Sequence, residues 1–388
     1  MTSTRVGIWG VFGRGNYGNE ATLEAFLAQL DPARFSPVIL TEEPEAASGL
    51  HGIPARLVGS PVSGGGNRIA RALGALRNRA AYLRHALRIV GDLDSVVVAG
   101  SGGLEIAHAF GTPFEIWGLS VATRIKRKGF VLLDVGVDRI ADPLARRFIR
   151  STAAHAAYRS YRDERSRACM RDNGLAAASS DPVVTDMAFS LRPPLADDRD
   201  PQLVVFGVID YGGPDRPGPG PAHDSYVARC AAVIERLLTA GHRVVIVAGD
   251  DGDVSTGHEI AARFARGVVR VSDASTTDEL VRVMSEARVV VASRYHTLIM
   301  AQMATTPVVS IGYNLKHLAM LEQLGVPAVH RDALDFDPDE VALLVEEAAA
   351  NYDRLSVQVA EGVQAARERL EAHWPAVLAA ISGRQETA

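Results

Sequence analysis

Short apolar runs alternate with longer stretches of helical periodicity along most of the chain. The apolar runs are rich in valine, isoleucine and leucine and have no polar face, which predicts strands buried on both sides. Such strands, separated by helices, form parallel sheets with crossover helices. In the first half, strands are predicted at residues 5–9, 37–40, 95–99 and 130–133, and helices at 20–30, 67–90, 117–128 and 143–157.

The alternation breaks at residues 191–201, which are rich in proline and aspartate and favour neither element. A second alternating series then follows, so the break predicts a domain boundary. We expect an α/β protein with two doubly wound, Rossmann-like domains facing a cleft, in which ligands bind beyond the carboxyl ends of the strands. The predicted parts are 1–195, 196–340 and a helical tail at 341–388, with a break in the tail at Asn351 and Tyr352.

Composition excludes several classes of protein. The 388 residues are 47% hydrophobic and 22% charged, which is ordinary for a globular protein and argues against disorder. Two cysteines, Cys169 and Cys230, cannot build a disulfide framework, and the chain shows no signal peptide and no run long enough to span a bilayer. We therefore expect a soluble cytoplasmic protein. The net charge of −5 argues against nucleic acid as a partner, and no metal-ligand spacing is present.

A glycine-rich turn, Gly13-Arg14-Gly15-Asn16-Tyr17-Gly18, separates the first strand from the first helix. Such a turn lets the backbone approach a ligand, and the following helix N-terminus offers N–H groups to an anion. Glu42 and Glu43 follow the second strand, where a dinucleotide site has its ribose-binding acid. The pattern favours a phosphate or sugar over a nicotinamide cofactor, and a tight turn without a ligand stays open.

The helix predicted at 67–90 lies in a stretch without acidic residues, between Glu45 and Asp92. Its apolar stripe is flanked by arginines, which is typical of helices that lie on an anionic membrane surface. An ordinary packed helix with a solvated face explains the same pattern. The stripe is formed by Ile69, Leu73, Leu76, Ala80, Leu83 and Leu87, and the arginines are Arg68, Arg71, Arg77, Arg79, Arg84 and Arg88.

Polar residues also follow the buried strand at 289–292, where Ser293, Arg294 and His296 precede or begin a helix. A guanidinium matches the planar shape of a carboxylate or phosphate, and an imidazole exchanges protons near neutral pH. Lys316 follows the next strand and is expected at the same edge of the sheet. The sequence therefore predicts an anion site here.

These residues resemble the C-terminal signature of the polysaccharide pyruvyl transferase family. The resemblance continues in the right order from about Gly7 to Gly325. It rests on Ser293-Arg294-Tyr295-His296, Pro307, Tyr313, Lys316 and Leu321–Gly325, on Gly15-Asn16-Tyr17-Gly18-Asn19-Glu20-Ala21, on Gly100-Ser101-Gly102-Gly103, and on Ser160–Ser166 with Asp186.

The resemblance implies the glycosyltransferase B architecture and the transfer of pyruvate from phosphoenolpyruvate onto a sugar, glycan or glycoside as a ketal, with phosphoenolpyruvate as co-substrate and no cofactor. His296 is then the acid or base. The donor is held by Ser293, Arg294, Lys316 and, from a glycine- and proline-rich loop at 211–221, Arg216. The acceptor side is formed by Gly15, Asn16, Tyr17, Asn19, Glu20, Gly102 and Gly103.

Two positions depart from the family pattern. Asn19 stands where the family usually has aspartate, and Asp210 follows the strand at 204–209 where an arginine is often found. Two alternatives therefore stay open. One is a glycosyltransferase that uses a nucleotide sugar, and the other is a carbohydrate-binding relative without activity.

Overall fold

The structure is a computed structural model that describes residues 3–59, 68–100, 104–105, 109–212, 218 and 220–383, with the side chains of 68–76 left out. The chain divides into two compact units. The first consists of Met1–Arg14, Thr22–Met187 and Arg369–Ala388, and the second of Gly15–Ala21 and Ala188–Glu368.

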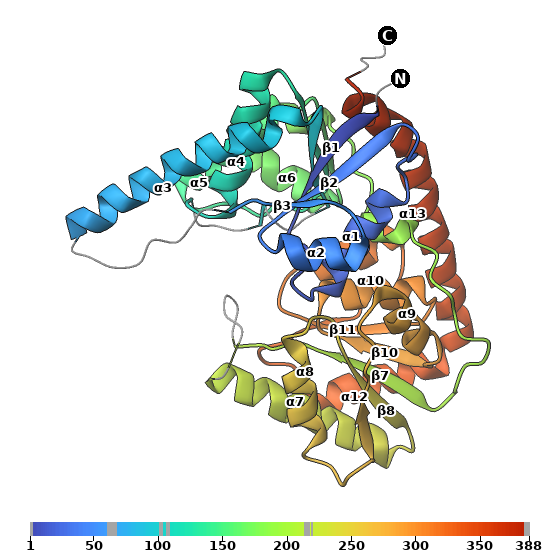
Figure 1. The fold of residues 1–388 in the computed structure, drawn as a ribbon. Coiled ribbons are helices and arrows are strands. Elements are labelled where there is room, and N and C mark those ends of the chain that lie inside the picture. The colour runs from blue at the N-terminus through green and yellow to red at the C-terminus, as the bar shows by residue number, and fades with distance from the viewer. Residues whose placement is uncertain are drawn as a thin grey trace. The chain divides into compact units, whose positions relative to one another are not determined.

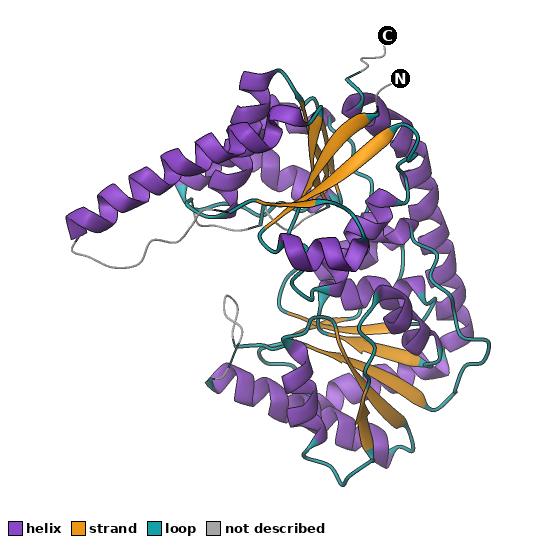
Figure 2. Cartoon of the chain, viewed as in Figure 1, coloured by secondary structure: helices purple, strands orange, loops and turns teal. Residues whose placement is uncertain are grey.

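The first unit is built on a six-stranded parallel sheet with strand order β3-β2-β1-β4-β5-β6 (Figures 1 and 2). The order reverses between β1 and β4, as in doubly wound folds. Helices α3, α4 and α5 contact one another in sequence and cover one face of the sheet. The elements are β1 (Thr4–Trp9), α1 (Tyr17–Leu27), β2 (Phe35–Thr41), α2 (Pro44–His51), β3 (Ala55–Leu57), α3 (Arg68–Ile89), β4 (Ser95–Ala99), α4 (Thr112–Lys126), β5 (Gly129–Val135), α5 (Pro143–His155), β6 (Tyr158–Tyr161) and α6 (Glu164–Asp172).

The second unit has a six-stranded parallel sheet with strand order β12-β11-β10-β7-β8-β9. Its order reverses between β7 and β10, whose residues are all buried. The elements are β7 (Leu203–Val208), α7 (Pro221–Thr239), β8 (Arg243–Ala248), α8 (Asp253–Ala261), β9 (Val269–Val271), α9 (Thr277–Ser285), β10 (Val289–Ala292), α10 (Tyr295–Met303), β11 (Val308–Gly312), α11 (Lys316–Leu324), β12 (His330–Asp332), α12 (Pro338–Ala350) and α13 (Tyr352–Ile381).

The predicted fold class is confirmed, but the division of the chain differs from the expected one in two places. Residues 15–21 group with the second unit, and helix α13 contributes to both units. Arg367 donates from that helix to the carbonyl oxygens of Phe189 and Leu191 at 3.0 Å, whereas Arg369 donates to Val184 of the first unit. The tail is therefore part of both cores. Its predicted break is present, because α12 ends at Ala350 and α13 begins at Tyr352.

The described part of helix α3 packs into the core of the first unit. Tyr82, Ala86 and Ile89 are buried, and Leu83 and Leu87 are packed against the same cluster. Ala80, which we placed on the apolar stripe, is exposed. The buried face is thus turned from the expected one toward Tyr82, whose hydroxyl donates to the Glu115 carbonyl oxygen at 2.8 Å. Among the described residues, no helix is both long and apolar enough to cross a bilayer.

Candidate functional site

The candidate site lies in the second unit, at the carboxyl ends of β7, β8, β10 and β11. Strand order reverses between β7 and β10, and ligands of doubly wound sheets bind at such a switch point. Asp210 follows β7 closely, and Arg294 follows β10 as the N-cap residue of α10. The N-terminus of α10, the positive end of the helix dipole, also lies at this edge.

At this edge, the guanidinium of Arg294 forms an ion pair with the carboxylate of Asp253. Both Nε and Nη2 donate to the carboxylate, the Nη2 bond being 2.7 Å long, and the Asp253 side chain is fully buried. Burial works to lower the pKa of Arg294, but the hydrogen bonds and charge of Asp253, with the charge of Asp250, raise it overall. Nη1 has no hydrogen-bond partner among the described residues. The arginine therefore keeps its charge and one amino group for a ligand.

Asp253 belongs to an acidic turn, Gly249-Asp250-Asp251-Gly252-Asp253, which follows β8 and binds the segment at residues 15–21. The Asn16 amide donates to Asp250 at 2.9 Å, and the Tyr17 hydroxyl donates to Asp251 at 2.7 Å. The backbones of Asn16 and Asp250 also form an antiparallel bridge. These contacts explain why a segment that follows β1 in the sequence groups with the second unit.

His296 lies on the first turn of α10 and is half-buried. Gly18 lies directly against it, because a Cβ atom added at Gly18 would overlap with the His296 side chain. The structure thus brings together Arg294, which was predicted to hold the donor, His296, which was predicted as the acid or base, and the motif at residues 15–21, which was predicted for the acceptor side.

Lys316 and Ser293 have different surroundings. Lys316 begins α11, and its ammonium lies 5.4 Å from the centre of the Tyr295 ring and 5.8 Å from that of Tyr313. Ser293 was expected to bind the donor, but it is fully buried and its hydroxyl lies 2.7 Å from the Tyr226 hydroxyl. Ser293 therefore stabilises the turn between β10 and α10, whereas Lys316 lies at the carboxyl edge of the second sheet.

Asp210, at the position where the family often has arginine, is part of a second polar group. Its backbone N–H donates to Asp253 at 2.8 Å, and its carboxylate lies 3.3 Å from Nδ1 of His223. Nε2 of the same histidine lies 2.9 Å from Glu259. The end of β7 thus presents a carboxylate and an imidazole rather than a guanidinium.

The first unit contributes fewer of the predicted site residues. Gly13 has a left-handed φ of 79° and touches the backbone of Glu43 and Ala47, so a side chain would not fit there. Glu42, considered as a ribose-binding acid, is instead paired with Arg14. The predicted residues Gly102, Gly103 and Arg216 lie outside the described residues.

The family's middle segment has a structural role in the first unit. Asp163 caps α6 by accepting from the Ser166 backbone N–H at 2.6 Å, and the buried Arg162 pairs with both Asp163 and Glu105. The Ser166 hydroxyl in turn accepts from the backbone N–H of Val137 at 3.1 Å. These bonds fix the carboxyl end of β5 and β6.

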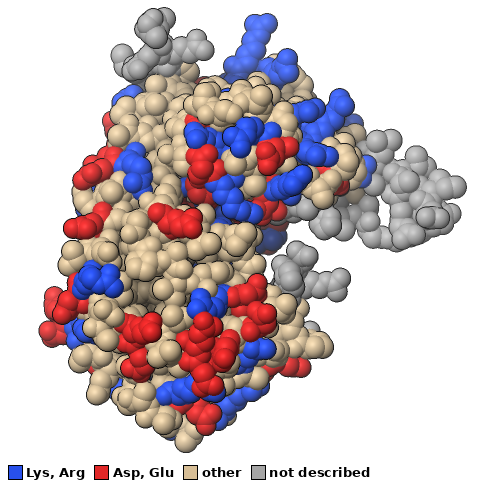
Figure 3. Space-filling view, turned by 180° about the vertical axis from the view of Figure 1, so that it is seen from behind, with Lys and Arg blue, Asp and Glu red and all other residues tan. Residues whose placement is uncertain are grey.

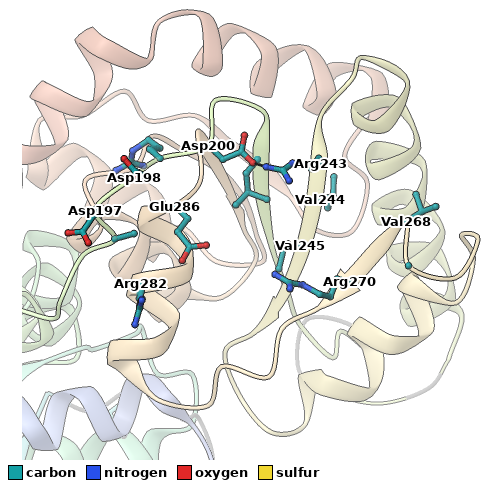
Figure 4. A pocket seen from close by; sticks show the side chains of 14 residues that line it. Asp197, Asp198, Asp200, Arg243, Val244, Val245, Val268, Arg270, Arg282 and Glu286 are labelled. Atoms are coloured by element: carbon teal, nitrogen blue, oxygen red, sulfur yellow. Dashed lines mark ion pairs between the residues drawn. The ribbon is translucent and has the colours of Figure 1, made fainter.

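Two cavities lie away from these residues. One, of about 690 Å³, lies at the amino ends of β7 and β8, the opposite edge of the second sheet, and Figure 4 shows Asp200 and Arg243 paired in its wall. The other, of about 460 Å³, lies in the first unit between Leu57, Tyr82 and His85. Neither contains Arg294 or His296.

Sequence reasoning missed the acidic turn. Asp250, Asp251 and Asp253 stand between glycines directly after a buried strand, which is the same signal that identified Arg294. No group of histidine, cysteine, aspartate or glutamate within the described residues has the geometry of a metal site.

A family model described as polysaccharide pyruvyl transferase matches residues 16–314 of this chain. The chain belongs to the polysaccharide pyruvyl transferase family. The match begins at Asn16 and ends at Asn314, so it includes both the segment that binds the acidic turn and the Arg294 region. This pyruvyl transferase family member is thus a transferase, and a comparison with curated protein sequences gave no match.

Solved structures show the same fold at low sequence identity. The UDP-GlcNAc 2-epimerase of Neisseria meningitidis, solved with UDP-GlcNAc, has a TM-score of 0.61 at 10% identity, covering 97% of this chain and 100% of its own. HepE of Anabaena, solved with UDP and glucose, has a TM-score of 0.60 at 12% identity, covering 98% and 99%. MurG of Acinetobacter baumannii has a TM-score of 0.56 at 11% identity, covering 96% and 99%. The pyruvyl transferase family member therefore has the glycosyltransferase B fold.

Proposed function

We propose that this protein transfers pyruvate from phosphoenolpyruvate onto two hydroxyl groups of a sugar, glycan or glycoside, forming a cyclic ketal. One observation carries the proposal: Arg294 and His296 lie two positions apart at the switch point of the second sheet, at the N-terminus of helix α10. A cation for phosphate or carboxylate and a proton-exchanging group are the two parts that this chemistry needs.

In the proposed reaction, the protonated imidazole of His296 gives its proton to the vinyl carbon of phosphoenolpyruvate. The carbon that bears the phosphate becomes electrophilic, and one acceptor hydroxyl adds to it while its proton returns to the imidazole. The second hydroxyl then displaces phosphate from the same carbon, and its proton leaves with the phosphate. The products are a cyclic ketal, whose central carbon carries the methyl and carboxylate groups of pyruvate, and hydrogen phosphate.

Arg294 and Lys316 are proposed to hold the anionic groups of the donor. The Nη1 group of Arg294 has no hydrogen-bond partner in the part of the chain that the structure describes, and the Asp253 carboxylate fixes the guanidinium plane. Fixing this plane reduces the entropy lost when a ligand binds. Lys316 adds a second cation from the first turn of α11.

The donor is tested by thermal shift with phosphoenolpyruvate in the millimolar range. A ligand that binds only the folded state raises the melting temperature, and the rise grows with the logarithm of the ligand concentration above the dissociation constant. We expect a concentration-dependent rise that is lost in Arg294→Ala. No rise with phosphoenolpyruvate, together with a rise for a nucleotide sugar, would contradict the proposal.

A nucleotide-sugar glycosyltransferase is the second candidate, and a specific observation favours it. The end of β7 has Asp210 and His223 rather than arginine, so this edge is less positive than a trianionic donor requires. Carboxylates can accept hydrogen bonds from sugar hydroxyls, which a nucleotide sugar supplies.

We also propose a cytoplasmic location with peripheral contact to an anionic membrane. Cys169 and Cys230 are both free, which suits a reducing compartment. Figure 3 shows many Lys and Arg side chains, with some Asp and Glu among them, at the upper right of the view, and exposed cations of α3, α4 and α5 contribute to the basic residues of the first unit. The exposed cations there are Arg77, Arg84, Arg88, Arg124, Lys126, Arg127, Arg147 and Arg150.

A further inference from the structure

Three contacts fix Tyr17 on the second unit. Its hydroxyl donates to Asp251 at 2.7 Å, its backbone N–H donates to the Gly249 carbonyl oxygen at 3.3 Å, and its own carbonyl oxygen accepts from the Thr277 hydroxyl at 3.5 Å. Burial, followed by the hydrogen bond and charge of Asp251, raises the pKa of Tyr17 well above its usual value. The phenol therefore stays protonated at neutral pH and donates to the Asp251 carboxylate.

The neighbouring residues strengthen this attachment. The Gly15 carbonyl oxygen accepts from the Asp251 backbone N–H at 3.0 Å, and Gly15 has a φ of 70° in close approach to the Asp251 side chain. The Asn16 amide donates to Asp250 at 2.9 Å. Residues 15–17 are thus held by both the backbone and the side chains of the acidic turn.

Gly18 follows Tyr17 in the sequence and lies directly against the His296 side chain. A Cβ atom at Gly18 would overlap with Cβ, Cγ and Nδ1 of the histidine, so the contact includes the base of the side chain and not only its far end. A rotation of the imidazole alone therefore cannot make room for a larger residue, and the ring or the backbone must move.

The same acidic turn also fixes the other proposed donor-side residue. Asp253 binds the Arg294 guanidinium through two donors, and Asp250 lies 3.8 Å from its Nη2 atom. The acidic turn therefore orients the Arg294 guanidinium directly, and it orients the His296 imidazole through Tyr17 and Gly18.

We infer that Tyr17 and Gly18 are positioning residues, which set the orientation of the His296 imidazole relative to the Arg294 guanidinium. The inference rests on the proposed function for its kinetic consequence, but the geometry it describes does not depend on the identity of the donor. It gives the glycine-rich motif at residues 15–21 a role beyond contact with an acceptor. A misplacement of a catalytic group by about 1 Å costs roughly a hundredfold in rate.

The test uses the full chain with Gly18→Ala, with Tyr17→Phe, and with Gly49→Ala as the matched control. Gly49 lies in helix α2 with no atom within 4 Å of an added Cβ, so the same change there meets open space. The imidazole resonances are followed by nitrogen–proton correlation spectra during a pH titration. His296 is assigned by the resonance that disappears in His296→Asn.

We expect Gly18→Ala to move the His296 resonances and their titration midpoint while the other histidines keep theirs. Phosphate release from phosphoenolpyruvate falls about ten- to a hundredfold, and the phosphoenolpyruvate dissociation constant changes less than about threefold. Tyr17→Phe gives a smaller change in the same direction, because it removes one hydrogen bond and keeps the ring. Gly49→Ala leaves resonances and turnover unchanged.

Unchanged His296 resonances in Gly18→Ala would overturn the inference, as would a loss of turnover that only follows the folded fraction. If Gly18→Ala fails to fold, Tyr17→Phe decides by the same readout. Should the unmodified protein release no phosphate from phosphoenolpyruvate, the proposed function fails, whereas the spectra still decide whether Tyr17 and Gly18 orient His296.

Discussion

The guanidinium of Arg294 is held by the buried carboxylate of Asp253, through two donor groups, at the switch point of the second sheet. Because of this pair, a substitution at Arg294 affects both donor binding and the stability of the fold. Removing the arginine takes away a ligand contact and also leaves a buried carboxylate without its partner. Stability and donor binding must therefore be measured together.

Arg294→Ala should weaken phosphoenolpyruvate binding by roughly thirty- to several-hundred-fold, the cost of losing a charge-assisted contact. It should also lower the free energy of unfolding by about 3–5 kcal/mol, because Asp253 becomes an uncompensated buried charge. Arg294→Lys should restore little of either, since an ammonium lacks the planar fork of donors. Calorimetric titration beside a denaturant melt measures both quantities. Normal stability of Arg294→Ala would show that the Asp253 pair is not formed in solution.

A double variant separates the two effects. Arg294→Gln with Asp253→Asn replaces the ion pair by two neutral amides that can hydrogen-bond to each other. We expect it to recover part of the stability lost in Arg294→Gln alone, with a coupling energy of about 0.5–3 kcal/mol, while donor binding stays weak. Strictly additive losses of stability would mean that the two side chains do not interact.

We expect His155 to make the stability of the first unit depend on pH. Burial, with the charge of Arg124 as a second cause, lowers the pKa of His155 from its ordinary value of 6.5. The unfolded chain then binds the proton more readily than the folded one, so stability falls as the pH drops below about 6.5. His155→Gln should flatten part of this fall between about pH 7.5 and pH 5.5. Denaturant melts at several pH values measure the slope.

His258→Gln is the matched control for that slope, because His258 lies exposed on helix α8. It should retain the full pH dependence of the unmodified protein. If the free energy of unfolding falls with pH equally steeply in His155→Gln and in the unmodified protein, His155 is not the cause of this fall.

Sequence patterns predicted the long buried strands and the break in the tail, because β7, β10 and the start of α13 have strong local signals. The short strands β3, β9 and β12 were missed. Each is three residues long at or near a sheet edge, too short for a periodic pattern.

The candidate site was predictable only in part. Arg294 and His296 stand directly after a buried strand, so their place at the carboxyl edge follows from the fold. The partner of Arg294 and the attachment of Tyr17 join residues that lie 41 and 234 positions apart. Such pairings depend on tertiary packing, which no local pattern in one sequence contains.

The basic surface on α3, α4 and α5 predicts binding to anionic vesicles. The attraction should fall as salt rises through about 0.1–0.5 M, since screening shortens the reach of exposed charges. Reversal of charge at Arg124 and Lys126, both to glutamate, should reduce flotation with anionic vesicles. The control reverses Arg263 and Arg266, which are exposed on the second unit. Equal flotation with neutral and anionic vesicles would remove the membrane contact from the proposal.

We propose that this chain transfers pyruvate from phosphoenolpyruvate with His296 as the proton-exchanging group. The most direct measurement follows phosphate release and ketal formation with phosphoenolpyruvate and a set of sugar acceptors, for the unmodified protein and for His296→Asn. We expect acceptor-dependent phosphate release with one ketal per phosphate. In His296→Asn, turnover should fall by about 10²–10⁴ at nearly unchanged donor affinity and melting temperature. Near-normal turnover of His296→Asn would contradict the assignment of His296, and transfer from a nucleotide sugar without any use of phosphoenolpyruvate would contradict the account as a whole.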